Sequence, residues 1–160
     1  MSNLNAFLAQ NAVQEENEKY VASKRFIEPV IDKETGKQKI GEDKKPIFEP
    51  VKWEICSILP QEDELIRKGC TKRLPVPGKR NMFSPETDYN SYLAQLAVKC
   101  TVFPNLHSKE LQDSYGVMGA EALLQVMLKP GEYQDYLVKV QEVNGFDVGI
   151  TELVEEAKNS

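Results

Sequence analysis

The sequence predicts an α+β protein in which a small N-terminal antiparallel β-hairpin or sheet packs on a mostly helical C-terminal bundle. Two observations lead to this prediction. Between residues 19 and 55, β-branched and aromatic residues are interleaved with polar ones and interrupted by turns. After residue 60, apolar residues instead recur at three- and four-residue steps. We therefore divide the chain into a hook and hairpin region (1–59) and a helical region (60–160), and expect one compact domain.

The N-terminal region begins with an apolar hook formed by Leu4, Phe7 and Leu8. A helix this short is unstable alone in water, so the hook must dock on another surface or fray. Residues 19–27 favour a strand, and residues 32–37 (DKETGK) a hairpin turn in which the glycine adopts a positive φ.

Prolines interrupt the strands that follow. Pro29, Pro46 and Pro50 cannot donate to a sheet ladder, so we expect edge or broken strands beside the charged connection 41–45. Val51, Trp53 and Ile55 then alternate with charged residues, which predicts a strand buried on one face.

The helical region opens with a helix predicted over residues 60–72, followed by a loop over 74–81. The clearest helix is predicted over residues 84–102. Ser84 is a natural N-cap and Pro85 suits the first helical position. Its apolar stripe comprises Tyr89, Tyr92, Leu93, Leu96, Ala97 and Cys100.

Further helices are predicted over residues 105–111, 120–128 and 133–143, with a short acidic helix capped by Thr151. Asn105 or Ser108 caps the first of them. Asn144-Gly145 followed by an apolar residue is typical of a Schellman stop. The helical tyrosines are either exposed contact residues or, as we expect, residues that rim the core with their hydroxyls outward: Tyr89, Tyr92, Tyr115, Tyr133 and Tyr136.

Composition and charge limit the classes of protein to which this chain can belong. The 160 residues carry a net charge of −5, distributed unevenly: 7 basic and 4 acidic groups over residues 51–83, but 5 and 12 over residues 84–160. No apolar run approaches the roughly 20 residues that span a bilayer, and the N-terminus does not resemble a signal peptide. Three scattered cysteines indicate free thiols in a reducing cytoplasm.

The sequence does not predict an enzyme. Its single histidine, His107, lies in a polar loop without an evident partner, and no phosphate-binding, zinc-protease or nucleophile-elbow motif occurs. The cysteines and this histidine lack metal-ligand spacing. We therefore expect no catalytic residue, no metal and no cofactor.

The most unusual local chemistry is a run of basic residues around a proline-rich loop. They are Arg67, Lys68, Lys72, Arg73, Lys79 and Arg80. One interpretation is a solvated loop between helices; the other is a semi-rigid arm that offers positive charge to an acidic partner. A small nucleic-acid-binding regulator is the alternative, weakened by the acidic chain and by the lack of interleaved aromatic residues.

Several motifs, in order along nearly the whole chain, resemble one family. They are residues 3–12 (NLNAFLAQNA), 53–55 (WEI), 70–73 (CTKR), 85–90 (PETDYN), 100–106 (CTVFPNL), 110–117 (ELQDSYGV), 130–133 (PGEY) and 140–147 (VQEVNGFD). The chain is similar in these motifs to the XkdN-like phage tail assembly chaperones of prophages and long-tailed phages of Gram-positive bacteria. Residues 28–50 depart from the family pattern as a longer hairpin.

The resemblance implies a non-enzymatic assembly factor in the cytoplasm of the bacterial host, absent from the mature virion. Its implied partners are the tape-measure protein, the tail-tube protein, other copies of itself and a longer form made by ribosomal frameshifting. Residues 157–159 (AKN) are compatible with codons that form a slippery heptamer. No membrane partner is implied.

Overall fold

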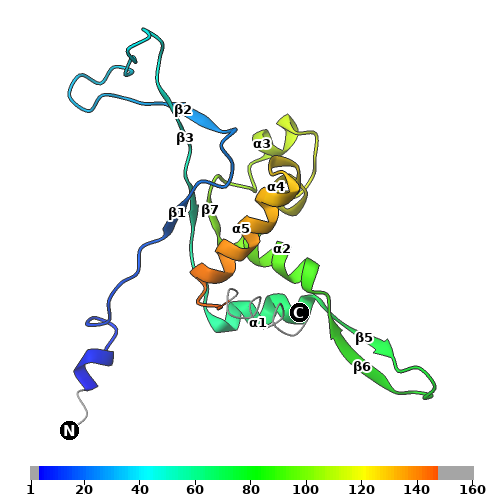
Figure 1. Cartoon of the computed structure of the whole chain (residues 1–160). Helices are drawn as coiled ribbons and strands as arrows, with labels where there is room; N and C mark the ends of the chain where they lie inside the picture. The colour runs from blue at the N-terminus through cyan, green and yellow to red at the C-terminus, as the bar shows by residue number, and fades with distance from the viewer. Residues whose placement is uncertain (1–3, 148–160) are drawn as a thin grey trace, which may run out of the picture.

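The structure, a computed structural model, describes residues 4–147. It confirms a mixed α+β fold, with small antiparallel sheets and five helices concentrated toward the C-terminus (Figure 1). In chain order the elements are a 3-10 helix η1 (Leu4–Phe7), β1 (Glu18–Tyr20), β2 (Ile27–Pro29), β3 (Phe48–Pro50), β4 (Trp53–Ile55), α1 (Pro60–Gly69), β5 (Thr71–Pro75), β6 (Phe83–Thr87), α2 (Tyr89–Cys100), β7 (Thr101–Phe103), α3 (Lys109–Ser114), α4 (Ala120–Met127) and α5 (Pro130–Val143).

A three-stranded antiparallel sheet in the order β1-β4-β7 forms one wall of the core. Trp53 and Ile55 of the central strand are buried, which confirms the alternation seen in the sequence. The strand β7 corrects the predicted helix over 84–102, because α2 ends at Cys100. Backbone pairing with β4 replaces further helical turns there, and the amide of Cys56 donates to the carbonyl of Cys100.

The helices α2, α4 and α5 pack against one another, and the core extends from them to the central strand. The ring of Tyr136 on α5 meets Trp53 edge-to-face at 5.2 Å between centroids. Its hydroxyl is also buried and hydrogen-bonds the hydroxyl of Thr101 at 2.5 Å. The expectation that the tyrosines point their hydroxyls outward is therefore wrong for Tyr136, and also for Tyr92, which is 3% exposed and donates its hydroxyl to Asp63.

The buried core draws on both halves of the chain, from the segment before β2 to the end of α5. Its members are Ala22, Trp53, Ile55, Cys70, Tyr92, Leu96, Ala97, Cys100, Leu106, Ala120, Leu123, Leu124, Met127, Leu128, Tyr136 and Val140. All three cysteines are free thiols, two of them buried. None of the described helices is long and apolar enough to cross a bilayer.

The start of α2 also differs from its prediction. Ser84 and Pro85 lie in strand β6, and the helix begins at Tyr89 with Asp88 as its N-cap. Residues 83–87 pair with β5, so their backbone groups are satisfied by a strand partner rather than by a helix. Most of the predicted stripe is buried, but Tyr89 is 60% exposed.

The C-terminal ends of α4 and α5 follow the sequence closely. Helix α1 ends at Gly69, short of the predicted residue 72, because Thr71 and Lys72 pair with β6, and α3 begins at Lys109 rather than at residue 105. Ser108 caps α3 by accepting a hydrogen bond from the amide of Leu111. At the end of α5, Gly145 has a φ of 85°, and the amide of Phe146 donates to the carbonyl of Gln141. These bonds form the predicted Schellman motif. The predicted helix at Thr151 lies outside the described residues.

Three segments project from the helical body (Figure 1). They are the N-terminal arm (residues 4–17), the long arm built on β2 and β3, and the hairpin of β5 and β6. The long arm contains the predicted turn at residues 32–37, with Gly36 at a φ of 69°. The charged connection 41–45 is a second closed turn, in which the amide of Gly41 donates to the carbonyl of Lys45.

Prolines occupy the outer edges of both projecting hairpins. In β2–β3, the residue pair at each end of the ladder is hydrogen-bonded: the amide of Val51 donates to Phe26, and the amide of Val30 donates to Ile47. Hydrogen-bonded pairs alternate with unbonded ones in an antiparallel ladder, so Pro29 and Pro50 fall at positions whose backbone nitrogen faces outward. Strands are tolerant of proline there, because no ladder donor is lost.

Candidate functional site

The predicted proline loop is a β-hairpin. Strand β5 pairs with β6 in a register that places Lys72 opposite Glu86, Arg73 opposite Pro85 and Leu74 opposite Ser84. The connecting residues 76–82 close with a hydrogen bond from the amide of Val76 to the carbonyl of Met82. The sequence prediction of an irregular loop over 74–81 was therefore correct only for this tip.

The structure places four of the six predicted basic residues on the hairpin. Lys72 and Arg73 lie on β5, and Lys79 and Arg80 lie at the tip; all four are exposed. Lys68 is exposed in the last turn of α1, next to the base of the hairpin. These five residues form what we call the basic hairpin surface.

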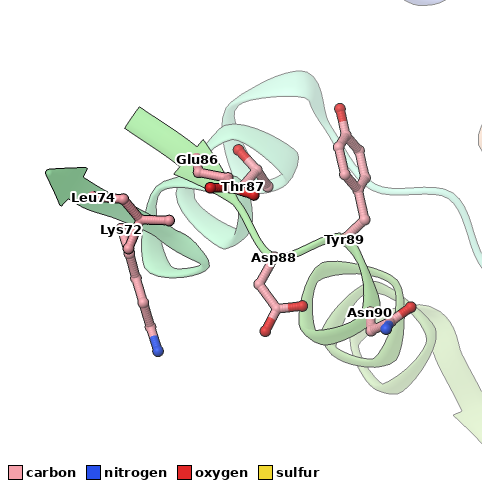
Figure 2. Close-up of a pocket in the computed structure, with 7 residues that line it drawn as sticks. All are labelled: Lys72, Leu74, Glu86, Thr87, Asp88, Tyr89 and Asn90. Carbon is pink, nitrogen blue, oxygen red and sulfur yellow. The ribbon is translucent and has the colours of Figure 1, made fainter. Parts of the chain in front are cut away.

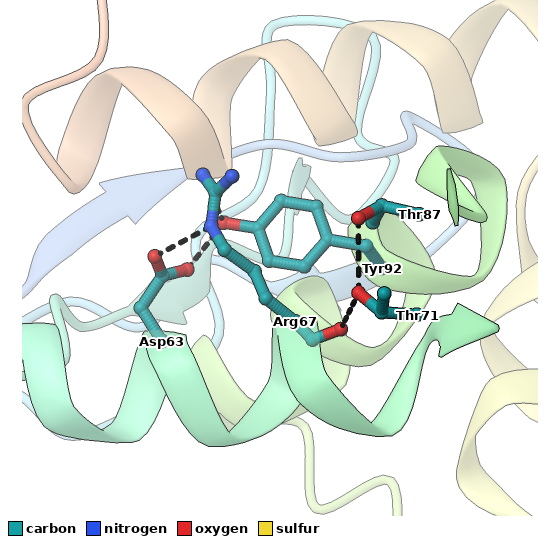
Figure 3. Close-up of polar contacts among 5 residues, drawn as sticks. All are labelled: Asp63, Arg67, Thr71, Thr87 and Tyr92. Carbon is teal, nitrogen blue, oxygen red and sulfur yellow. Dashed lines mark hydrogen bonds and ion pairs between the residues drawn. The ribbon is translucent and has the colours of Figure 1, made fainter. Parts of the chain in front are cut away.

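Arg67 does not belong to this free surface. Its Nε donates to Asp63 Oδ2 at 3.0 Å, and its Nη2 donates to the hydroxyl of Tyr92 at 3.2 Å (Figure 3). The guanidinium also lies 4.5 Å from the centre of the Tyr92 ring. The hydroxyl of Tyr92 in turn donates to Asp63. Arg67 thus holds α1 against α2 while its side chain stays 38% exposed. Its role in partner binding remains a prediction.

The cluster changes the acid–base properties of its members. Burial, together with the hydrogen bond to the negatively charged Asp63, raises the pKa of Tyr92 to about 12. The hydrogen bond to Asp63 also raises the pKa of Arg67. The sequence offered one signal for this cluster, because residues 63 and 67 are four apart and lie on one helix face.

Two threonines connect the cluster to the base of the hairpin. The hydroxyl of Thr71 donates to the carbonyl of Arg67 at 2.7 Å and lies 2.9 Å from the hydroxyl of Thr87 (Figure 3). Thr71 and Thr87 face each other across an unbonded pair of the ladder, where side chains approach most closely. The direction of the hairpin is therefore fixed by α1.

Pro75 and Pro85 have the same edge placement as the prolines of the long arm. The pairs at the two ends of this ladder are hydrogen-bonded, from Asp88 to Cys70 and from Val76 to Met82. Because bonded and unbonded pairs alternate between them, both prolines fall in unbonded pairs. Neither outer edge presents a full row of donors to an added strand. We conclude that the hairpin is suited to recognition through its side chains.

A shallow depression of about 340 Å³ lies between the hairpin and the start of α2. It is lined by Lys72, Leu74, Glu86, Thr87, Asp88, Tyr89 and Asn90 (Figure 2). The side chains of Lys72 and Tyr89 point in opposite directions from its two sides. Two carboxylates and one lysine among its lining residues give it a mixed charge, which suits a peptide surface better than a phosphate backbone.

The N-cap carboxylate in this depression is already engaged. The amide and hydroxyl of Ser91 donate to Asp88, at 3.2 and 2.9 Å. These hydrogen bonds, the backbone one above all, hold the pKa of Asp88 below its usual range. Asp88 therefore fixes the start of α2 rather than serving as an acid or base.

Exposed apolar side chains accompany the cations, a feature that the sequence prediction missed. Leu74, Met82 and Phe83 are 44%, 52% and 59% exposed along the hairpin. Within residues 4–147, no group of three or more histidine, cysteine or carboxylate side chains is arranged to hold a metal ion. His107 is exposed, as expected for a surface residue.

Comparison with known proteins shows what this architecture resembles. The chain is 32% identical to the uncharacterized protein YqbN of Bacillus subtilis strain 168, over 98% of this chain and 93% of that protein. It is 29% identical, over the same shares, to the phage-like element PBSX protein XkdN of that strain. The crystal structure of YqbN matches with a TM-score of 0.64 at 26% identity, covering 92% of this chain and 99% of the other.

The chain therefore falls in the class of phage tail assembly chaperones, which is generally non-catalytic. The family model described as phage XkdN-like tail assembly chaperone protein matches residues 4–158. The chain belongs to this XkdN-like family, which confirms the resemblance drawn from its motifs.

Proposed function

We propose that this chaperone binds the tape-measure protein and helps to recruit tail-tube subunits during tail assembly, without catalysis. It acts in the cytoplasm of the bacterial host and is absent from the mature virion. A long, partly apolar tape-measure chain would aggregate before a tube encloses it, so a reversible cover is needed. Many weakly bound copies on one filament supply such a cover through multivalency.

The observation that supports this proposal is the basic hairpin surface. It combines five cations with exposed apolar residues on an arm whose outer edges resist strand addition. We expect it to hold acidic, amphipathic helical segments, because cations select acidic partners while apolar side chains provide burial. Lys72, Arg73, Lys79 and Arg80 then contribute to the contact, with Lys68 beside them.

Co-expression with the tape-measure protein of the same gene cluster tests the proposal. We expect the two proteins to co-purify, and reversal of the four hairpin cations to glutamate to weaken binding by about tenfold or more at low salt. The matched control reverses Lys33, Lys37, Lys39 and Lys44, four exposed cations of the long arm. No association of the wild-type proteins would contradict the proposal, and equal loss in both variants would contradict the role of the hairpin.

The same preparations separate this proposal from nucleic-acid binding. A nucleic-acid-binding regulator predicts an affinity that falls by roughly 0.9 log units per log unit of salt for each phosphate neutralised on duplex DNA. We expect no binding of duplex DNA or single-stranded RNA at low salt under conditions where the tape-measure protein is retained.

We further propose that a longer, frameshifted form shares the tape-measure protein with this one. The support is the codon pattern compatible with residues 157–159, which lie outside the described residues. The nucleotide sequence decides the matter: a slippery heptamer with an overlapping downstream frame supports it, and the absence of either rejects it.

A further inference from the structure

A groove of about 310 Å³ lies where the end of α5 meets the start of α1. Its lining residues are Ile58, Pro60, Asp63, Asn144 and Phe146. The amide of Ile58 donates to Oδ1 of Asn144 at 2.9 Å, so the two helices are joined at this point. Leu59 beside the groove is 65% exposed, and Phe146 within it is 39% exposed. The groove therefore offers apolar side chains to a further segment.

Cations continue from this groove along α1. The guanidinium of Arg67 lies 6.0 Å from the centre of the Phe146 ring, and its side chain is 38% exposed. Lys68 follows in the last turn of α1 and is exposed. Two carboxylates nearer the start of the helix are engaged, because Asp63 accepts from Arg67 and Glu62 from a backbone amide. A segment that fits this surface carries apolar side chains followed by carboxylates.

The sequence continues with such a segment directly after the groove. Residues 148–160 (VGITELVEEAKNS) follow Asp147, the neighbour of Phe146. Apolar residues recur in them at three- and four-residue steps, with carboxylates between. The apolar residues are Ile150, Leu153, Val154 and Ala157, and the carboxylates are Glu152, Glu155 and Glu156. In a helix these two sets occupy different faces.

The number of residues in the segment suits the length of α1. From Pro60 to Lys68 a helix advances by about 12 Å, because each residue contributes about 1.5 Å. From Asp147 to Glu155 the sequence covers the same eight positions. A helix that leaves Asp147 and runs beside α1 therefore brings Glu155 and Glu156 level with Lys68.

We propose that the 148–160 segment docks along α1 of its own chain. Its apolar face covers the groove beside Phe146, and Glu155 and Glu156 lie next to Lys68. The occupant is the chain's own segment, since attachment at the edge of the groove keeps it there at an effective concentration on the order of millimolar. Charge complementarity then fixes the direction in which the segment runs.

Docking has a consequence for partner binding. Lys68 belongs to the basic hairpin surface, so the docked carboxylates cover one of its cations and lie at the base of the hairpin. An acidic tail partner must displace the segment before it gains the whole surface. This competition rests on the proposed function, whereas the docking itself does not.

Carbodiimide cross-linking, which joins a carboxylate to an amine in contact, tests the docked position without any partner. In the dilute full chain we expect Glu155 or Glu156 to be joined to Lys68. When chains labelled with nitrogen-14 and nitrogen-15 are mixed, each linked pair should carry one label, because the contact lies within one molecule. Glu15 and Glu16, an equally acidic pair in the N-terminal arm, are the control and should not link to Lys68. Links that join the two labels, or that bypass α1, overturn the proposal.

Hydrogen exchange tests whether the groove holds the segment. The amides of residues 150–157 should exchange about tenfold faster in Leu59→Ser than in the wild type. Leu59 is the N-cap residue of α1, and serine is a better cap, so the substitution removes an apolar side chain without weakening the helix. The control Met118→Ser removes a 92% exposed apolar side chain elsewhere and should leave the exchange unchanged. Equal exchange in the wild type and Leu59→Ser overturns the proposal.

Charge reversal tests the pairing with α1. Lys68→Glu and Glu155→Lys/Glu156→Lys should each speed the same exchange several-fold, and the chain that carries all three substitutions should regain slow exchange. Urea unfolding followed by Trp53 fluorescence confirms that each variant is folded. Exchange that stays fast in the combined variant overturns the pairing of the segment with Lys68.

Binding of the tape-measure protein tests the competition. Leu153→Ser/Val154→Ser releases the segment and leaves every hairpin cation in place, so we expect affinity for the tape-measure protein to rise about tenfold. Unchanged affinity overturns the competition. Failure of every chain to bind the tape-measure protein contradicts the proposed function alone, because cross-linking and exchange test the docking without it.

Discussion

The hydroxyl of Tyr92 on α2 donates a hydrogen bond to the carboxylate of Asp63 on α1. Arg67 completes the contact by donating to both residues. Because Thr71 bonds the carbonyl of Arg67, this partly buried contact also determines how the hairpin leaves the body. The stability of the cluster and the position of the basic hairpin surface are therefore linked.

Asp63→Ala should destabilise the fold by about 1–3 kcal/mol, because the buried hydroxyl of Tyr92 and the guanidinium of Arg67 both lose their acceptor. Urea unfolding followed by Trp53 fluorescence measures the change. Glu64→Ala on the exposed side of the same helix is the matched control and should alter the free energy of unfolding by less than about 0.5 kcal/mol. Equal effects would show that the cluster contributes nothing specific.

The helix caps predict a loss of stability in acid. The pKa of Asp88 is lowered by hydrogen bonds from Ser91, and that of Glu132 chiefly by the backbone amide of Lys129. Both carboxylates favour the folded state when ionised, so their contribution is present above their unfolded pKa values and is lost as pH falls through the folded ones.

Asp88→Asn retains a capping oxygen but cannot ionise. Its urea midpoint should therefore fall less between neutral pH and the acidic range than that of the wild type. The measurement is a series of urea titrations at decreasing pH. A parallel decline in both proteins would remove Asp88 as a source of the acid sensitivity.

Substitution of one buried and one exposed leucine compares how much core packing and surface side chains contribute to the free energy of unfolding. Leu96→Ala should cost about 2–5 kcal/mol, because a fully buried side chain leaves a cavity among the three packed helices. Leu65→Ala removes a 70% exposed side chain and should change the free energy of unfolding by less than about 0.5 kcal/mol. Both values follow from urea unfolding of the purified variants.

The thiols should react in order of their exposure. Burial raises the pKa of Cys100 to about 11, and it also raises that of the half-buried Cys56. Since the thiolate is the nucleophile, iodoacetamide should modify Cys56 before Cys100 in the folded protein. Peptide mass spectrometry over time measures the order, and modification of Cys100 first would contradict the packing around Asn144, which bonds its sulfur.

Much of this fold could be predicted from periodicity and capping. The alternation around Trp53, the stop at Gly145 and the cap at Ser108 depend on neighbours along the chain, which local patterns report. The helix start at Ser84 was wrong for a physical reason. Pro85 suits both a first helical turn and an outward edge position, and only pairing with distant β5 decides between them.

The candidate site could be predicted only in part. The cations around residues 67–80 can be recognised from composition, but the contact of Arg67 with Tyr92 cannot, because the two residues are distant in sequence. The buried hydroxyl of Tyr136 was missed for the same reason, since Thr101 lies thirty-five residues away. The exposure of Phe83 required knowledge of the hairpin, because the residue had been expected just before a helix.

The outward-facing prolines affect what happens when many copies of this chain lie close together. In the proposed coat, copies along one filament bring their hairpins close together, and ordinary strand edges there would pair into continuous cross-β sheets. The outer edges carry Pro29, Pro50, Pro75 and Pro85. Because proline has no backbone N–H, these edges lack donors that pairing between hairpins of different copies would need. The proposed coat can therefore be dense and still dissociate when the tail tube replaces it around the tape-measure protein.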